Sequence, residues 1–257
     1  MFKIVIRFFD RIFPQSRLID TCARFSNYLQ IKSLKKKANF EISILYNSNS
    51  DLQLARLCEK YGSDKGGLYG KKKHLSWDDH TYTDYYSSIF DHCRDHVNNV
   101  FECGIGSNFS DQDSSMGQDG IPGASLRVWR DYFQNAHIFG ADIDERVLFQ
   151  DDRITTFAMD QCNSSSIEAA LGKIPNVKFD LIIDDGLHTF DAGITLFRNC
   201  FPKLSANGIY CIEDVVPQDL DRFRQYFEKF DYCVNFINLY RPNSALLDNS
   251  LVIVRRA

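Results

Sequence analysis

Short apolar runs alternate with amphipathic segments from about residue 99 to the end of the chain. The apolar runs have the length and the Val, Ile and Phe content of buried strands, and they lie at 100–103, 137–141, 154–159, 179–183 and 208–212. Apolar residues at helical spacing fill the segments between them, at 127–133, 164–171, 192–200 and 220–230. Strands that alternate with helices predict an α/β fold with a doubly wound, mostly parallel sheet.

Two further runs of β-type residues, 232–239 and 251–254, follow at the end of the chain. The connection between them contains Pro242 and Asn243 and can form a hairpin, which predicts an antiparallel edge. We therefore expect a Rossmann-like, seven-stranded, mostly parallel sheet with an antiparallel last strand. This domain is expected at 58–257, after a helical N-terminal extension at 1–57.

The segment 1–37 has the pattern of one or two amphipathic helices and is rich in Arg and Lys. It lacks the uninterrupted apolar core and the small-residue cleavage site of a signal peptide. A basic amphipathic helix can make peripheral contact with an anionic membrane or dock against a partner subunit. The alternative is a helix that packs on its own domain.

The composition is that of a soluble globular protein. The chain has 257 residues, a net charge of −4 and no basic stripe, so no nucleic-acid partner is expected. No stretch approaches the roughly 18 apolar residues of a membrane span. The eight cysteines form no C-x-x-C pair, which favours a reduced, cytoplasmic chain over a disulfide scaffold or a zinc site. We also expect a homo-oligomer.

Two of the predicted strands end abruptly in acids. The polar residues that follow these strands are Asp184, Asp185, His188, Glu213 and Asp214. Because ligands bind at the carboxyl ends of parallel strands, we expect these side chains to converge on one crevice. Carboxylates at such short distances repel one another unless a cation lies among them. Oxygen ligands suit a hard ion such as Mg²⁺. His188 could then serve as a base. The alternative is that the acids are solvated helix caps.

The first strand ends in a glycine turn, Glu102-x-Gly104-x-Gly106. These glycines permit a tight turn and a close approach of the backbone to a ligand. The position of a third glycine is taken by Phe109, which argues against a dinucleotide and disfavours a dehydrogenase. A long, polar, Gly-rich loop at 107–124 follows the turn, and we expect it to close over a ligand.

Acids also follow the second and third strands. Asp142 can accept hydrogen bonds from both hydroxyl groups of a ribose, and Asp160 can accept one from an adenine amino group. Acids at the ends of three successive strands suit a positively charged adenosyl ligand better than a pyrophosphate, which is the arrangement that binds S-adenosylmethionine. The alternative is that Asp142 and Asp160 only cap helices.

With these motifs, the chain resembles the class I S-adenosylmethionine-dependent methyltransferases. Within them it is most similar to the metal-dependent sugar O-methyltransferases that act on antibiotic and surface-polysaccharide sugars. The resemblance covers roughly residues 58 to 216, and its motifs lie at 61–65, 80–86, 101–106, 115–117, 122–133, 140–144, 160–161, 184–188 and 212–214. Asp-Asp-Gly-x-His followed by Glu-Asp is its most specific part. Larger members of the family carry an auxiliary domain, which is not expected within this length.

The resemblance implies a role for each matching residue. Asp185, Glu213 and Asp214 match the carboxylates that hold a Mg²⁺-type ion, with His188 as the general base and Asp185 as a second catalytic residue. The implied cofactor shell consists of Glu102, Gly104, Gly106, Ser107, Ser125, Asp142, Asp144, Asp160, Gln161 and Asp184. The segments 61–65 and 80–86 match pieces that fold over cofactor and substrate, without an assigned role.

The expected function is therefore metal-assisted O-methylation of a sugar hydroxyl group, with S-adenosylmethionine as the methyl donor. The family favours a nucleotide-activated sugar made for a capsule or a lipopolysaccharide. Lys65, Arg127 and Arg130 could meet its diphosphate, or they could be surface charges. The alternatives are a catechol-type small-molecule O-methyltransferase and an adenosyl-binding protein without catalysis.

Overall fold

The computed structural model describes residues 42–45, 51–68, 75, 77–112, 114–240 and 246–257. The amphipathic segment expected at 1–37 lies outside these residues, as does the turn at 241–245. Within the described ranges, every helix is too short or too polar to reach across a bilayer.

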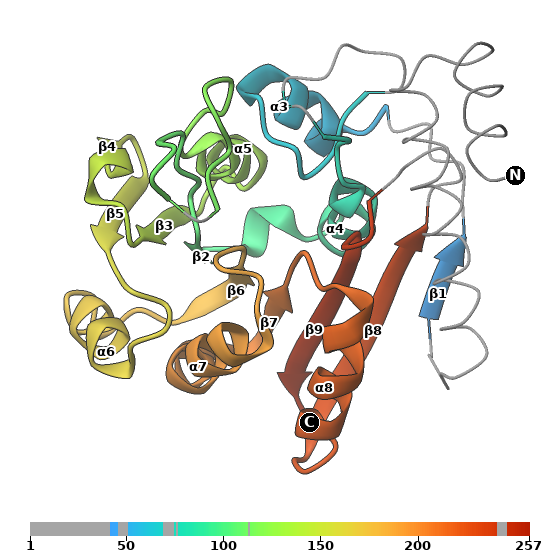
Figure 1. Cartoon of the computed structure of the whole chain (residues 1–257). Helices are drawn as coiled ribbons and strands as arrows, with labels where there is room; N and C mark the ends of the chain where they lie inside the picture. Colours follow the sequence, from blue (N-terminus) through green and yellow to red (C-terminus); the bar gives the residue numbers. More distant parts are fainter. Residues whose placement is uncertain (1–41, 46–50, 69–74, 76, 113, 241–245) are drawn as a thin grey trace, which may run out of the picture.

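The described strands form one nine-stranded sheet (Figure 1). In chain order they are β1 (Ile42–Leu45), β2 (Asn99–Cys103), β3 (His137–Asp142), β4 (Gln150–Asp151), β5 (Ile154–Ala158), β6 (Phe179–Asp184), β7 (Leu204–Ile212), β8 (Tyr232–Tyr240) and β9 (Ser250–Arg256). Their order across the sheet is β1-β8-β9-β7-β6-β2-β3-β5-β4. The inner strands β5, β3, β2, β6 and β7 are parallel, whereas β9 runs antiparallel to both β7 and β8. The predicted fold class, with its antiparallel last strand, is confirmed.

Two strands go beyond the predicted seven. β4 is a short antiparallel edge strand beside β5. β1 pairs in parallel with β8, although residues 42–45 were expected within a helical extension. The expectation of helix was wrong there, because the β-branched residues Ile42 and Ile44 favour a strand. The domain boundary after residue 57 stays a prediction, and it falls inside the helix Gln53–Tyr61.

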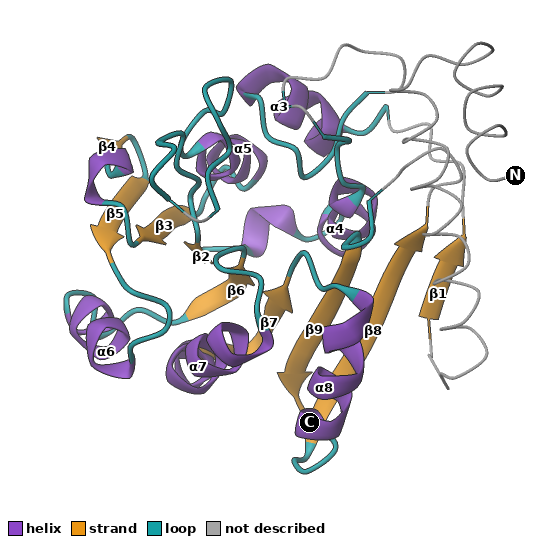
Figure 2. Cartoon of the chain, viewed as in Figure 1, coloured by secondary structure: helices purple, strands orange, loops and turns teal. Residues whose placement is uncertain are grey.

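Helices cover both faces of the sheet (Figure 2). They are α3 (Gln53–Tyr61), α4 (Tyr82–Phe90), α5 (Ala124–Tyr132), α6 (Ser164–Gly172), α7 (Phe190–Cys200) and α8 (Pro217–Phe227). One apolar cluster joins α3, α4 and α5 to one face, and a second joins α6, α7 and α8 to the other. Side chains alternate along each strand, so Ile183 enters the first cluster and its neighbour Ile182 the second. This alternation decides which acids can reach the site.

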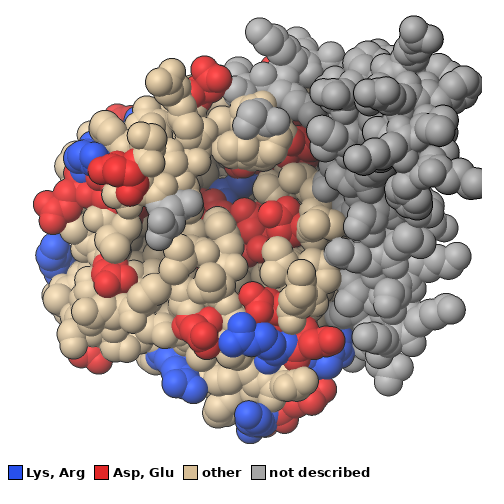
Figure 3. All heavy atoms as spheres, in the orientation of Figure 1, with Lys and Arg blue, Asp and Glu red and all other residues tan. Residues whose placement is uncertain are grey.

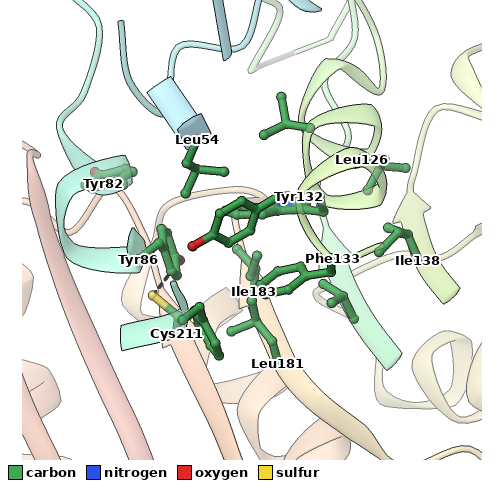
Figure 4. Close-up of a cluster of buried hydrophobic side chains, with 14 of the residues drawn as sticks. Leu54, Tyr82, Tyr86, Leu126, Tyr132, Phe133, Ile138, Leu181, Ile183 and Cys211 are labelled. Carbon is green, nitrogen blue, oxygen red and sulfur yellow. Dashed lines mark hydrogen bonds between the residues drawn. The ribbon is translucent and has the colours of Figure 1, made fainter. Parts of the chain in front are cut away.

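The first cluster is dominated by aromatic side chains. Figure 4 shows Tyr132 and Phe133, at the end of α5, beside Leu181 and Ile183 of β6. Tyr86 of α4 lies in the same layer. All five side chains are fully buried, and Phe133, Leu181 and Ile183 each contribute about 1.5–3 kcal/mol through burial of apolar surface. The cluster fixes α3, α4 and α5 above the sheet and so positions the loops between them.

Candidate active site

A cavity of about 430 Å³ lies at the carboxyl ends of the parallel strands. Its walls are the ends of β2, β3, β5, β6 and β7, the segments 62–65 and 77–82, the loop at 104–125 and residues 246 and 248. The expected closing loop therefore borders the cavity. Red carboxylate atoms gather inside the hollow of Figure 3, together with a smaller blue patch.

The glycine turn packs against the neighbouring strand end. Gly104 has φ +86°, and its N–H donates to the carbonyl oxygen of Ala141. A Cβ atom at this position would collide with the carbonyl oxygen of Asp185. The glycine is therefore required by a close approach of two backbone segments of this chain, and not only by a ligand.

Most of the predicted cofactor shell lines the cavity. The residues in this position are Gly104, Gly106, Ser107, Ser125, Asp142, Asp160 and Gln161. Asp142 accepts hydrogen bonds from the backbone N–H groups of Ile105 and Asp144, one on each carboxylate oxygen, both at 2.9 Å. Each oxygen keeps a second lone pair that a ligand hydroxyl group can use. The acids at the ends of β3 and β5 thus face one space.

Three members of the predicted shell, Glu102, Asp144 and Asp184, do not line the cavity. The structure therefore does not place them in direct contact with a ligand in this cavity. Asp184 points to the opposite face from Asp185, because adjacent strand residues alternate, and it accepts a hydrogen bond of 2.6 Å from Gln161. Asp144 accepts a hydrogen bond of 2.7 Å from Ser107. Glu102 is fully buried and accepts one of 2.9 Å from Trp129. Asp144 and Asp184 each hold a cavity-lining residue.

The strand register brings the two acid pairs together. β6 and β7 pair Asp184 with Ile212, so the next residues, Asp185 and Glu213, lie side by side. The backbone N–H of Glu213 donates to the carbonyl oxygen of Asp184 at 2.9 Å. Asp185, Glu213, Asp214 and His188 all line the cavity, as expected from strands that end at the same edge.

The three predicted metal ligands are not arranged as one group in this structure. Asp185 and Glu213 share the ammonium of Lys65, with 2.7 Å between Lys65 Nζ and Asp185 Oδ2. The other oxygen of Glu213, Oε1, accepts a hydrogen bond of 2.6 Å from Tyr86. Asp214 instead faces His188, with 3.7 Å between Nε2 and Oδ2. Ligand atoms of Asp185, His188 and Asp214 lie within 4.8 Å of one another, which fits a hard ion between the two aspartates.

Lys65 lies among the acids of the site, a position that the sequence did not predict. Its side chain is almost fully buried and lies 3.1 Å from Glu102 as well as next to Asp185 and Glu213. Burial opposes its charge, but the three carboxylates outweigh burial and raise the pKa of Lys65 well above its ordinary value. The alternative of a surface charge is wrong, because Lys65 is buried, and contact with a diphosphate stays a prediction that the surrounding acids do not favour.

The other two cations proposed for a diphosphate lie away from the cavity. Arg127 donates to the carbonyl oxygen of Pro122 and stacks on Phe149. Arg130 pairs with Asp131 and Asp151. Among the described residues that line the cavity, Lys65 is the only Lys or Arg. The cavity is therefore acidic apart from this one ammonium and two histidines.

Asp214 is held by aromatic and imidazole groups from a distant segment. Tyr82 donates a hydrogen bond of 2.6 Å to its Oδ1, and His80 Nε2 lies 3.3 Å from the same atom. Burial raises the pKa of Asp214, but His80 and His188 outweigh burial and hold this pKa below its ordinary value. Both His188 and Asp214 have φ +54°, a left-handed backbone that side chains rarely adopt. The chain thus accepts local strain where it presents these two groups.

His80 is charged in this setting. Burial opposes its charge, but Asp214, Asp248 and Asp64 outweigh burial and raise the pKa of His80 to about 10. Its ring stacks on Tyr82, with 4.7 Å between the centroids. The motifs at 61–65 and 80–86 were the available signals for Lys65, His80 and Tyr82, but the acids at 185, 213 and 214 that they contact lie more than a hundred residues away in sequence.

The pKa values of the two acids beside Lys65 shift in the opposite direction to the pKa of Asp214. Burial raises the pKa of Glu213 to about 7, although Lys65 lowers it in part, and the repulsion of Glu102 adds to the rise. Burial likewise raises the pKa of Asp185 well above its ordinary value. Crowded, buried carboxylates of this kind are stabilised in their charged form by additional positive charge, so the site favours a cation.

Sequence comparison finds antibiotic-sugar methyltransferases. The chain is 33% identical over 162 residues to 8-demethyl-8-alpha-L-rhamnosyl tetracenomycin-C 2'-O-methyltransferase of Streptomyces olivaceus. This alignment covers 63% of this chain and 37% of that protein. It is 32% identical over 136 residues to demethylmacrocin O-methyltransferase of Streptomyces fradiae, over 53% of this chain and 32% of the relative. The chain thus matches about a third of the length of each of these relatives. No model of a known protein family matches it.

Structure comparison finds a methyltransferase with the same fold. MycE methyltransferase from the mycinamycin biosynthetic pathway, solved in complex with Mg, SAH and mycinamycin VI, superposes with a TM-score of 0.58 at 22% identity. The superposition covers 81% of this chain and 55% of MycE. Together the comparisons confirm that the chain is similar to the class I S-adenosylmethionine-dependent methyltransferases and, within them, to sugar O-methyltransferases.

Proposed function

We propose that this protein transfers the methyl group of S-adenosylmethionine to a hydroxyl group of a sugar carried by a small molecule, with the help of a divalent ion, most simply Mg²⁺. One observation carries the proposal. The glycine turn with Asp142 and Asp160, and the group of Asp185, His188 and Asp214, open into the same cavity of about 430 Å³. A methyl donor in the first part and an acceptor in the second would meet within one cavity.

The cofactor half suits an adenosyl group with a positive charge. Asp142 offers acceptor oxygens to ribose hydroxyl groups, and Asp160 lies beyond it at the end of β5. A sulfonium carries one positive charge, which the acids of the cavity would stabilise. Ala124 and Ser125 at the start of α5 border the same space, where backbone N–H groups of the first helical turn have no partners within the helix.

The acceptor half suits a hydroxyl group that must lose its proton. We assign Asp185 and Asp214 as the residues that would hold the ion, with Glu213 behind them. A divalent ion in this position lowers the pKa of a coordinated hydroxyl group and orients its oxygen. His188 Nε2 would accept the proton, and Asp214 Oδ2, 3.7 Å away, would stabilise the resulting imidazolium.

The charge of the cavity separates two kinds of substrate. A nucleotide sugar brings a diphosphate, which proteins usually bind with Arg, Lys or free helix N–H groups. In the described lining, acids outnumber the single ammonium of Lys65, which is surrounded by carboxylates. One similar protein is named for a rhamnosyl group already attached to tetracenomycin-C. We therefore favour a glycoside of a neutral scaffold, and the capsule or lipopolysaccharide precursor expected from the sequence gains no support.

The experiment is a comparison of acceptors. Purified protein with S-adenosylmethionine and Mg²⁺ would be given an aryl rhamnoside, a nucleotide-diphosphate rhamnose or a catechol, and S-adenosylhomocysteine formation would be measured. We expect turnover of the rhamnoside that a chelator abolishes and Mg²⁺ restores. Turnover of the catechol alone would replace the sugar assignment, and turnover that a chelator leaves unchanged would remove the ion from the proposal. The cytoplasmic location, the homo-oligomer and the membrane contact of segment 1–37 stay predictions.

A further inference from the structure

Two groups of potential metal-ligand atoms in this site share one residue. The first consists of Asp185, His188 and Asp214, and the second of Glu102, Asp185 and Glu213. Within each group, the ligand atoms lie within 4.8 Å of one another. A carboxylate common to two such groups is the arrangement by which proteins hold two cations a few ångströms apart. The geometry is thus that of a centre for two cations.

The second position is already filled by a cation of the chain itself. Lys65 Nζ lies 2.7 Å from Asp185 Oδ2, 3.1 Å from Glu102 Oε1 and next to Glu213 Oε2. The Oε1 atom of Glu102 is buried and has no hydrogen-bond partner among the described residues, so its charge is balanced by the ammonium alone. Without that ammonium, three carboxylates would repel one another, and two of them, Glu102 and Glu213, are fully buried.

The backbone delivers this ammonium from a fixed position. The N–H of Thr83, at the start of α4, donates to the carbonyl oxygen of Lys65 at 3.1 Å. A Cβ atom on the next residue, Gly66, would collide with the side chain of Thr83, so the segment lies directly against α4. Gly62, with φ +75°, ends α3 and turns the chain into the cavity. Lys65 is therefore part of the frame of the site and not a swinging surface side chain.

From these contacts we propose that Lys65 is a permanent second cation, bridged by Asp185 to a single exchangeable divalent ion on the Asp214 side. The inference rests on the proposed function only for the presence of that ion. Lys65 acts as a positioning residue: it holds Asp185 where Asp185 also reaches His188 and Asp214. A monovalent ammonium in the second position limits the centre to one divalent ion.

The stoichiometry of Mn²⁺ binding to the full chain tests the inference. Calorimetry or electron paramagnetic resonance would count ions bound by the wild type and by Lys65→Ala, in which the ammonium is removed and its volume left open. We expect one ion per chain in the wild type and two in Lys65→Ala. The control is Lys60→Ala, which removes an exposed lysine paired with Asp131, and which should still bind one ion. A count in Lys65→Ala that does not exceed the wild-type count would overturn the inference.

The wild type provides a second measurement in case Lys65→Ala does not fold. Reductive methylation with mass spectrometry reports which amines are accessible. Lys65 should resist methylation with and without Mn²⁺, while Lys60 reacts in both states. Methylation of Lys65 that appears only with Mn²⁺ would show that the ion displaces the ammonium, which contradicts a permanent cation.

These outcomes separate the inference from the proposed function. Two ions on the wild type would overturn the role of Lys65 and leave ion-assisted transfer intact. No ion on the wild type, with one ion gained in Lys65→Ala, would support the role of Lys65 and remove the ion from the proposed function.

Discussion

The two halves of the cavity are built in different ways. In the cofactor half, Gly104 and Asp142 are fixed by backbone hydrogen bonds within and between adjacent strand ends. In the acceptor half, Asp185 and Asp214 are fixed by charged and aromatic side chains, chiefly Lys65 and Tyr82, from segments far away in the sequence. The first half thus depends on backbone geometry and the second on balanced charge, so substitutions should damage them differently.

The largest expected effect is on the acceptor half. His188→Ala should reduce turnover by about 10²–10⁴-fold, because a general base contributes that much to proton removal. Affinity for S-adenosylmethionine should stay within about twofold, since the cofactor half does not depend on this side chain. Initial rates and calorimetry measure the two quantities, with the exposed His92→Ala as control. Near-normal turnover would remove the base assignment.

Gly104→Ala attacks the cofactor half through its backbone. The left-handed φ of +86° and the collision with the Asp185 carbonyl should together destabilise the fold by about 3 kcal/mol or more. Urea denaturation measures the free energy of unfolding. The matched control is Gly172→Ala at the end of α6, where an added Cβ meets nothing within 4 Å. Equal stability of the two variants would mean that the turn is more tolerant than its geometry indicates.

Tyr82→Phe sharpens the difference by removing one hydroxyl group from the acceptor half. That group donates to Asp214 Oδ1 at 2.6 Å, and a hydrogen bond to a charged group contributes about 2 kcal/mol. We expect weaker Mn²⁺ binding, by roughly tenfold or more, with cofactor affinity unchanged. Tyr85→Phe on the same helix is the control, because no hydrogen bond of its hydroxyl group is found among the described residues. Equal ion affinity in both variants would show that Tyr82 does not position Asp214.

Asp184 gives the smallest expected effect and lies behind the cavity. Burial raises the pKa of its carboxyl to about 6, although His188 and Gln161 lower it in part. The folded state therefore binds a proton that the unfolded state has lost between about pH 4 and 6, so this group's contribution makes stability fall as pH rises through that window. At pH 8 the free energy of unfolding of Asp184→Asn should be about 1 kcal/mol higher than that of the wild type. This difference should vanish near pH 4. A constant difference across this range, in denaturation at several pH values, would contradict the raised pKa.

The same contrast explains what could be predicted from sequence. Asp142 and Asp185 follow apolar runs that are visible in the sequence. The fold and the convergence of the acids could therefore be inferred from the spacing of apolar residues and from the order of strands and helices. Lys65 could not, because its partner Asp185 lies 120 residues away and a buried lysine has no periodic signal. The alternation of side chains along β6 is the sequence signal that turns Asp184 away from Asp185 and the cavity.

The distance from a bound ion to the S-methyl group, with both halves of the cavity filled, tests whether donor and acceptor meet in one cavity. Mn²⁺ bound at the acceptor half should strongly accelerate proton relaxation of the S-methyl group of S-adenosylmethionine in the ternary complex, and accelerate that of the adenine protons much less. We expect this result, which would place the ion and the methyl group in one cavity. Binding of both ligands without a selective effect on the S-methyl protons would contradict it.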